Sequence, residues 1–519
     1  MNRRLLVLIV LILPFCTHGQ FSIQWQKCMG GTNDEIVRSI QKTSDSGFIV
    51  GSSTLSNDVD VSGNHGNLDG WVIKLNSVGA IEWKKCLGGS ILEETYSIQQ
   101  TFDGGYIVAA VSTSNDGDVT NNHGDYDIWV VKLDSIGTIQ WEKCLGGSDS
   151  EDVYSIQQTS DGGYVISGGT ASNNADVSGN HGAYDAWVVK LDSIGAIQWQ
   201  KCLGGSGNEL AYSIQQTSDG GYVLTGYTTS NDGDLFGIIG VGILWVAKLN
   251  DMGIIQWQRR LGGSISELGY SIHQTYDEGY ILSGVTSSND GDVTGNHGSD
   301  DAWLVKLDSS GAIQWQRCLG GSNNEQAYSI QQTLDSGFIV AGFTTSNDGD
   351  VSGNFGAIDA WVVKLNEVGV VQDQKCLGGS GVETAYSIQQ LSDGSFIVGG
   401  YTSSVDGDVI GNHGATDSWI VKLNYNVGIE ELSILSNFTI YPVPSNDELN
   451  IEYSFSEAAD VKLEIRNILG ETLLQPVFLK NQVGLNVTKL PISNLHDGIY
   501  FLNMTTKEGS ISKKVIVNH

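Results

Sequence analysis

The chain has 519 residues, of which 59 are acidic and 27 basic, so its formal net charge is −32 at pH 7. This acidic excess argues against a nucleic-acid partner and against binding to anionic lipid, because both attract lysine and arginine. Hydrophobic residues make up 40% of the chain, which is enough for a packed core and excludes wholesale disorder.

Residues 1–19 have the pattern of a secretory signal peptide. Two arginines precede the apolar run of residues 5–15, and small residues just before Gln20 predict cleavage there. A lipoprotein signal that uses Cys16 is the alternative, although the bulky residues before that cysteine fit its small-residue positions poorly. No later stretch has the ~18 apolar residues of a transmembrane helix, so we expect a soluble or surface-attached mature protein.

A repeat of 58 residues runs through the chain as far as about residue 432. One tryptophan series has six members at this spacing: Trp25, Trp83, Trp141, Trp199, Trp257 and Trp315. A second series has seven members: Trp71, Trp129, Trp187, Trp245, Trp303, Trp361 and Trp419. Because the copies contain no insertion or deletion, they predict a rigid repeating unit.

Within one copy, four strand patterns alternate with turns. The predicted strands cover residues 96–101, 106–111, 128–133 and 139–145. A polar loop rich in Asn, Asp and Gly separates the second strand from the third. The unit shows no sustained 3.6-residue period, which argues against helix.

Seven four-stranded units predict an all-β fold, a seven-bladed β-propeller over residues 20–432. A β-solenoid is the alternative, but its rungs are usually much shorter than the repeat seen here. The fourth-strand pattern already occurs at residues 23–28, before the first full copy. We therefore expect this N-terminal strand to complete the last blade beside residues 419–423, which removes free sheet edges.

The spacing and the phrase Ser-Asp-Gly-Gly-Tyr-Val-Ile-Ser-Gly-Gly at residues 160–169 resemble the β-propeller repeats of secreted bacterial proteins. They are also distantly similar to kelch-type blades. The resemblance covers most of the chain and implies a binding or scaffolding role.

Two charged residue types occupy fixed positions in all seven copies. The glutamates are Glu35, Glu93, Glu151, Glu209, Glu267, Glu325 and Glu383. The lysines are Lys74, Lys132, Lys190, Lys248, Lys306, Lys364 and Lys422. Two such rings would suit a polar tunnel, but a group used alike by every blade is more typical of a hydrogen bond or ion pair between blades.

The polar loop between the second and third strands is the candidate metal site. Asp116, Asp118 and Asp127 offer carboxylate oxygens, which calcium prefers. The alternative is conformational, since turns favour Asp, Asn and Gly, and the EF-hand spacing is absent. A recurring histidine of this loop is replaced by Ile239 and Phe355 in two copies, which excludes a histidine-dependent metal site in every blade. Calcium remains a hypothesis, and no other cofactor is predicted.

The fourth copy carries an apolar stretch, residues 235–244, where the other copies carry polar residues. It either folds back on its blade or exposes a patch for a partner.

Six cysteines remain after signal removal, all at one repeat position, with Arg260 at the seventh. They are Cys28, Cys86, Cys144, Cys202, Cys318 and Cys376. Equivalent positions on the outer strands of adjacent blades are expected to lie beyond the ~7 Å Cα separation that a disulfide allows. We therefore predict free thiols that are buried as small hydrophobic groups.

No catalytic motif stands out. Sialidase chemistry needs three arginines that converge on a substrate carboxylate, but only four arginines lie between residues 20 and 432, and two of them occupy the same blade position. Gly-x-Ser-x-Gly, His-Glu-x-x-His and phosphate-loop patterns are absent. We therefore predict no catalytic residues and a protein that is not an enzyme.

Residues 433–519 have a different composition, because every tryptophan precedes them and they contain four of the five prolines. They predict a small Ig-like β-sandwich. Its strands are expected at residues 438–441, 448–453, 461–465, 471–474, 484–490, 498–504 and 510–517.

The phrases Phe438-Thr-Ile-Tyr-Pro-Val-Pro-Ser445, Ile465-Arg-Asn-Ile-Leu-Gly470 and Leu495-His-Asp-Gly-Ile-Tyr-Phe501 carry a second resemblance. They are similar to the type A C-terminal sorting domain of type IX secretion substrates in Bacteroidota, with Val443 where that family commonly has Asn. The resemblance implies export through the periplasm, contact with the type IX machinery, and release or display at the outer-membrane surface.

The sequence as a whole predicts a secreted or cell-surface propeller that binds or adheres to an unknown extracellular protein or glycan. The alternative is an extracellular propeller hydrolase or lyase that acts on glycans.

Overall fold

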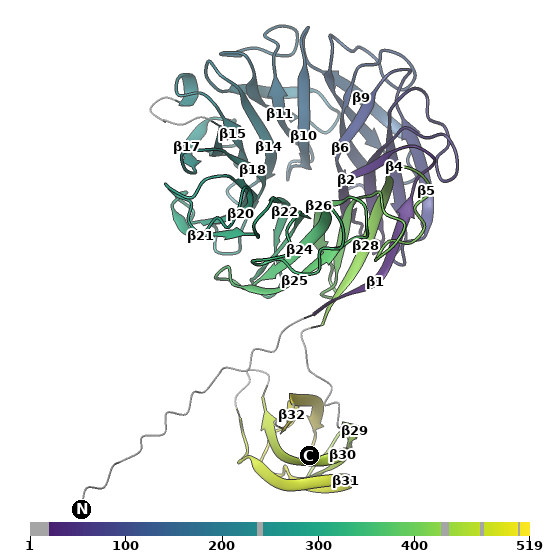
Figure 1. Ribbon diagram of the computed structural model, residues 1–519, viewed down its shortest axis with the longest axis vertical. Coiled ribbons are helices and arrows are strands. Elements are labelled where there is room, and N and C mark those ends of the chain that lie inside the picture. Colours follow the sequence, from purple (N-terminus) through teal and green to yellow (C-terminus); the bar gives the residue numbers. More distant parts are fainter. Residues whose placement is uncertain (1–19, 236–241, 427–434, 468–471, 507–508) are drawn as a thin grey trace, which may run out of the picture. The chain divides into compact units, whose positions relative to one another are not determined.

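The computed structural model describes residues 20–235, 242–426, 435–467, 472–506 and 509–519 (Figure 1). Two compact units are present, one formed by Phe21–Tyr425 and the other containing Asn426–His519. The predicted signal peptide lies outside the described residues. Within the described ranges, no helix is long and apolar enough to cross a membrane.

The larger unit contains seven four-stranded antiparallel sheets arranged around a central axis, which confirms the seven-bladed propeller (Figure 1). The strands are β1 (Gln20–Met29), β2 (Glu35–Lys42), β3 (Phe48–Thr54), β4 (Asp69–Leu75), β5 (Ile81–Leu87), β6 (Glu93–Gln100), β7 (Tyr106–Ser112), β8 (Asp127–Leu133), β9 (Ile139–Leu145), β10 (Glu151–Gln158), β11 (Tyr164–Thr170), β12 (Asp185–Leu191), β13 (Ile197–Leu203), β14 (Glu209–Gln216), β15 (Tyr222–Thr228), β16 (Ile243–Leu249), β17 (Ile255–Leu261), β18 (Glu267–Gln274), β19 (Tyr280–Thr286), β20 (Asp301–Leu307), β21 (Ile313–Leu319), β22 (Glu325–Gln332), β23 (Phe338–Thr344), β24 (Asp359–Leu365), β25 (Val371–Leu377), β26 (Glu383–Gln390), β27 (Phe396–Thr402) and β28 (Asp417–Asn426). A short 3₁₀ helix, η1 (Gly233–Leu235), lies in the fourth blade.

Each blade has an almost fully buried middle and a half-exposed outer strand. In the second blade, every residue of β7 and β8 is buried, because neighbouring blades cover both faces of the sheet. This explains the continuous apolar runs of these strands. The outer strand β9 is buried only at its C-terminal end. Gly104, in the turn between the first two strands, has a φ of +81°, which favours glycine there.

The N-terminal strand completes the last blade, as predicted. That sheet has the order β1-β28-β27-β26. β1 makes the contacts that outer strands make elsewhere: Gln26 accepts a 2.7 Å hydrogen bond from the Trp419 indole, and Trp25 packs edge-on against Phe48 with 6.0 Å between ring centroids. The ring of blades is therefore closed by pairing the first strand with the last.

The six cysteines of the propeller are free and buried, which confirms the prediction. Burial is also the largest cause that raises the pKa of their thiols, for example that of Cys86 to about 12.

The recurring charged residues do not line the axis. Glu93, on β6, accepts hydrogen bonds from the Gly89 amide at 2.7 Å and the Ser112 hydroxyl at 2.6 Å, so it fixes the connector that enters its own blade. Lys132, on β8, lies 2.9 Å from Asp103 in a turn of the same blade. The interpretation of the lysines as ion pairs between blades is therefore wrong, because each lysine and its carboxylate belong to one sheet.

The described ends of the apolar stretch in the fourth blade are buried, at Leu235 and Leu244. Residues 236–241, between them, lie outside the described residues.

The C-terminal unit contains β29 (Leu435–Tyr441), β30 (Glu448–Arg466), β31 (Val477–Pro491), β32 (Gly498–Thr506) and β33 (Gly509–Val517). Both halves of β30 contribute alternate apolar side chains to one core, as expected for a small β-sandwich. The prediction of separate strands at 448–453 and 461–465 is wrong, because register shifts between Phe455 and Val461 disrupt the pairing locally without ending the strand. The predicted strand at 471–474 is reduced, among its described residues, to a single bridge from Thr472 to Arg466.

Candidate functional site

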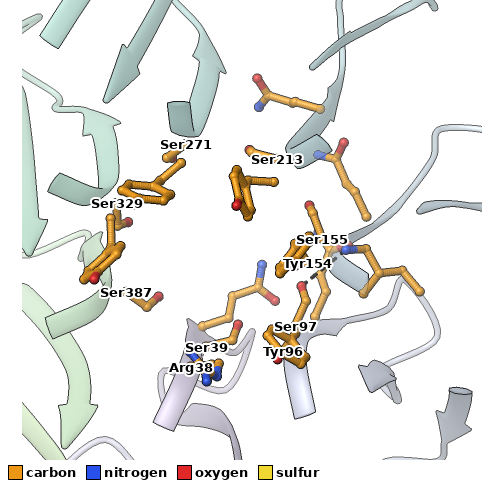
Figure 2. Close-up of a pocket in the computed structure, with 18 of the residues that line it drawn as sticks. Arg38, Ser39, Tyr96, Ser97, Tyr154, Ser155, Ser213, Ser271, Ser329 and Ser387 are labelled. Atoms are coloured by element: carbon orange, nitrogen blue, oxygen red, sulfur yellow. Dashed lines mark hydrogen bonds between the residues drawn. The ribbon is translucent and has the colours of Figure 1, made fainter. Parts of the chain in front are cut away.

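The inner strands of the seven blades surround a central cavity of about 290 Å³ (Figure 2). These strands are β2, β6, β10, β14, β18, β22 and β26. Three repeat positions supply most of the polar lining, so the wall consists of rings of equivalent side chains.

The first ring, called the tyrosine ring here, contains Arg38 from the first blade and one tyrosine from each other blade. The tyrosines are Tyr96, Tyr154, Tyr212, Tyr270, Tyr328 and Tyr386. Each lies at a register shift of its inner strand, as between Thr95 and Ser97 in β6. Such a bulge re-aims a side chain out of the regular alternation. Centroids of successive tyrosine rings are 4.7–5.5 Å apart, so the rings contact one another.

Arg38 closes the tyrosine ring as a cation. Its guanidinium carbon lies 4.8 Å from the centroid of Tyr96 and 5.1 Å from that of Tyr386, within cation–π range. Its Nη2 is 2.6 Å from Glu94 Oε1. The other oxygen of Glu94 accepts a 3.1 Å hydrogen bond from the Tyr96 hydroxyl. Figure 2 shows Arg38 and Tyr96 beside the open centre of the cavity.

A second carboxylate, that of Asp152 on β10, makes this part of the ring different from the rest. Asp152 occupies the repeat position of Glu94 and accepts a 2.7 Å hydrogen bond from the Tyr184 hydroxyl. Burial raises the pKa of Asp152; the Tyr184 bond opposes this shift and the Glu94 charge adds to it. The other blades carry neutral residues at this position: Ile36, Leu210, Leu268, Gln326 and Thr384.

The second and third rings are polar and tie the blades together. The serine ring consists of Ser39, Ser97, Ser155, Ser213, Ser271, Ser329 and Ser387. The glutamine ring consists of Gln41, Gln99, Gln157, Gln215, Gln331 and Gln389, with His273 at the seventh position. Gln41 Oε1 accepts a 2.7 Å hydrogen bond from the backbone N–H of Gln100 in the next blade. These bonds satisfy inner-edge backbone N–H groups that have no neighbouring strand.

The predicted calcium residues contact two different connectors. Asp116 and Asp118 accept hydrogen bonds from the amides of Ser90 and Gly88, at 2.7 and 3.4 Å, before the second blade. Asp127 accepts a 2.9 Å bond from the His123 amide and lies next to the third blade's Glu151. Among the described residues, no three His, Cys, Asp or Glu side chains form a group that would hold a metal ion. The carboxylates of Asp116, Asp118 and Asp127 therefore do not converge on one site that could hold calcium.

Buried carboxylate pairs at the connectors were not predicted from the sequence. Asp127 and Glu151 both have side chains next to Gly146, where an added Cβ would lie 2.8 Å from Asp127 Oδ1 and 2.3 Å from Glu151 Oε2. Burial is the largest cause that raises the pKa of both groups, and hydrogen bonds oppose it. The need for space between two carboxylates explains the glycine at this position of the repeat.

The three tunnel rings were missed as well. The available signal was the phrase Tyr-Ser-Ile-Gln-Gln, which recurs with few changes in the first strand of the repeat. Polar Ser and Gln two residues apart indicate one polar face on a strand inside a β-protein.

Comparisons with known proteins identify the C-terminal unit best. Over 176 residues, 30% of this chain, the protein is 28% identical to the regulatory protein FlaEY of Caulobacter vibrioides, and it spans only 18% of that protein's length. Among solved structures, prolyl oligopeptidase B from Galerina marginata is 11% identical, with a TM-score of 0.38, over 86% of this chain and 57% of that one. A family 32 β-fructofuranosidase from Bombyx mori is 14% identical, with a TM-score of 0.26, over 69% of this chain and 84% of that one. Residues 439–518 match the family described as secretion system C-terminal sorting domain, which confirms the resemblance found in the sequence phrases of the C-terminal unit and indicates a secreted or cell-surface protein.

Proposed function

We propose that the protein is an extracellular binding module, in which the propeller takes up a ligand at the tyrosine ring and the sorting domain delivers the propeller through the periplasm and the type IX machinery. The mature protein is then a binding or adhesion protein of the outer cell surface or the medium. Its ligand is an extracellular protein or glycan.

The observation that carries this proposal is the repetition of equivalent groups around the central cavity. An enzyme generally brings several different groups to one point, whereas rings of Ser and Gln offer many copies of the same hydrogen-bonding group. Partly exposed tyrosines add flat aromatic surfaces, which are enriched at binding sites because they combine a large apolar area with a polar hydroxyl.

Truncation after Ser436 is expected to abolish export by a type IX-competent host, because it removes the matched sorting domain. The measurement is the amount of propeller in the medium and on the cell surface against the amount retained in the periplasm. Fusion of residues 433–519 to an unrelated periplasmic passenger is the control, and it is expected to export that passenger. Normal export of the truncated chain would contradict the sorting role.

Tyr154→Ala is expected to weaken ligand binding at least about tenfold, because aromatic anchors often carry more than 1 kcal/mol of binding energy. The ligand is found by probing glycan and protein arrays with the purified protein. Tyr276→Ala is the matched control, because Tyr276 is 68% exposed in a turn outside the cavity. Equal binding by both variants would place the ligand site elsewhere on the propeller.

A glycan-cleaving enzyme is the second candidate, and the carboxylates of Glu94 and Asp152 favour it. They lie on neighbouring inner strands, Glu94 is paired with a cation, and the raised pKa of Asp152 suits a proton donor. Array glycans incubated with the protein are analysed for shorter products. Cleavage that Asp152→Asn abolishes would establish the enzyme, and intact glycans with retained binding would favour the binding module.

A further inference from the structure

The cavity wall beyond the tyrosine ring offers side-chain hydrogen-bond donors. The glutamine ring shows why. The side-chain oxygens of Gln41, Gln99 and Gln157 accept 2.5–2.7 Å hydrogen bonds from backbone amides of the next blade. Those of Gln215, Gln331 and Gln389 do the same at 2.6–2.8 Å. Because the side-chain oxygen bonds to the neighbouring strand, the NH₂ group of each glutamine is the part of the side chain that can bind a ligand in the cavity.

These NH₂ groups have no protein acceptor. Within the described parts of the chain, none of the six glutamines donates a side-chain hydrogen bond to another residue. Each NH₂ group carries two hydrogens, so the six glutamines line the cavity with N–H donors that have no acceptor among the described residues. The donors belong to one residue type, which the same bond holds in one orientation in six of the seven blades, so the arrangement is a feature of the repeat.

The serine ring, two residues earlier on each inner strand, repeats this arrangement in some blades. Ser97 and Ser213 accept 3.3 Å hydrogen bonds from the amides of Ile156 and Ile272 in the next blade. Among the described residues, the hydroxyls of Ser97 and Ser213 have no protein acceptor. The hydroxyls of Ser39 and Ser387 instead donate to backbone carbonyls of the next blade, at 3.5 and 3.3 Å, so the serine ring supplies donors to the cavity only in part. Figure 2 shows the serines of all seven blades around its open centre.

We propose that the axis of the propeller, between the serine ring and the glutamine ring, is a binding site for a small inorganic anion. Convergent N–H and O–H donors stabilise negative charge, and hydrogen bonds to charged groups are stronger than those between neutral groups. A ring of equivalent donors fits a compact ion on its axis better than a planar or extended group. The cavity of about 290 Å³ has room for such an ion and several waters, since one water takes up roughly 30 Å³.

The charged groups beside the neighbouring tyrosine ring are Arg38, Glu94 and Asp152. Burial raises the pKa of Asp152, which disfavours the negative charge of that carboxylate. Arg38 is a cation of the neighbouring ring, and its pairing with Glu94 offsets the charge of that carboxylate. At the position of the missing seventh glutamine, burial lowers the pKa of His273 to about 4, so its neutral ring offers one further N–H donor at pH 7. This site lies deeper along the strands than the proposed ligand site and does not depend on it.

The proposal is tested with the whole mature protein, by calorimetric titration and thermal melting with chloride, sulfate or acetate. Ionic strength is held constant with a bulky sulfonate buffer. Chloride or sulfate is expected to bind and to raise the melting temperature as its concentration increases. A response to acetate alone would overturn the inorganic-anion proposal in favour of a ligand carboxylate, and the absence of any anion-specific response would indicate a cavity filled with water.

Two neighbouring substitutions separate the site from a general charge effect. Gln99→Glu keeps a side-chain oxygen that can accept from the backbone N–H of Gln158. It replaces the NH₂ group by a second oxygen and adds a negative charge. It is expected to weaken anion binding at least about tenfold. Gln100→Glu makes the same change one residue later, where the side chain does not line the cavity and its oxygen bonds to the Ser44 amide. This control is expected to keep the wild-type affinity.

Equal loss in both variants would overturn the proposal. Should Gln99→Glu melt too early for titration, Ser97→Ala provides a second test, because it removes one donor without adding a charge. It is expected to weaken binding in the same direction, and unchanged affinity in that variant would count against the site.

Discussion

Deletion of residues 21–28, the body of β1, is expected to lower the melting temperature of the propeller by several degrees. The deletion leaves β28 as an open edge, removes the acceptor of the Trp419 indole, and exposes the core around Phe396 and Tyr425 that Phe21 covers. Truncation of a buried phenylalanine alone costs about 3–5 kcal/mol. An unpaired edge strand also promotes association between molecules, so the deleted protein is expected to aggregate on heating.

The control for this deletion is Gln24→Ala, an exposed position of the same strand, which is expected to change stability by less than about 0.5 kcal/mol. A synthetic peptide of residues 20–29 provides a stricter test. It is expected to bind the deleted protein and restore the melting temperature, because the gap beside β28 remains. An unchanged melting temperature after deletion would mean that the pairing of β1 and β28 contributes little to closing the ring.

The periodicity of the sequence was sufficient to predict the propeller and its closure. A constant spacing of tryptophans showed the blade length, and the displaced fourth-strand pattern at residues 23–28 showed that the last blade needs a strand from the other end. The tryptophan spacing and the strand pattern can be read from short stretches of sequence that recur every 58 residues. The sorting domain was recognisable for a related reason, since its phrases lie in consecutive segments of one small unit.

The lining of the cavity and the connector pairs could not be predicted in the same way. The orientation of Tyr96 depends on a bulge, which shifts it out of the alternation that a regular strand would impose. The pairing of a glutamate with an aspartate of the preceding blade arises only when two sheets pack together. The prediction of an ion pair between blades for Lys132 was wrong, because the repeat shows that a residue recurs but not whether its partner lies in the same sheet.

One connector pair lacks the histidine that accompanies most of the others. Asp301 has the ring of His297 at 2.7 Å, whereas the equivalent Asp359 has Phe355 at that position. Among the described residues, its hydrogen-bond donors are the backbone amides of Phe355 and Gly356, at 2.9 and 3.3 Å. Burial raises the pKa of Asp359 to about 6; the two backbone hydrogen bonds oppose this rise and the charges of Glu383 and Asp408 add to it.

This raised pKa predicts that Asp359 makes the fold less stable as the pH increases. The folded protein binds the proton of Asp359 more tightly than the unfolded chain does, so the stabilisation is present at acidic pH and is lost as the pH rises from about 4 to about 6. Asp359→Asn keeps a neutral group beside Glu383. The difference in free energy of unfolding, variant minus wild type, is expected to be larger at pH 7–8 than at pH 4 by up to about 3 kcal/mol. The NH₂ group of the asparagine cannot accept the backbone hydrogen bond that one carboxylate oxygen accepts, which lowers the stability of the variant at every pH.

The measurement is urea unfolding of both proteins from pH 4 to pH 8, compared as a difference so that all other titrating groups cancel. Phe355→His is the matched variant: Phe355 is 63% exposed, so a histidine fits, and it would supply the partner that His297 supplies to Asp301. It is expected to lower the pKa of Asp359 and to flatten the pH dependence without removing the carboxylate. Parallel pH profiles for the wild type and Asp359→Asn would contradict the raised pKa of Asp359.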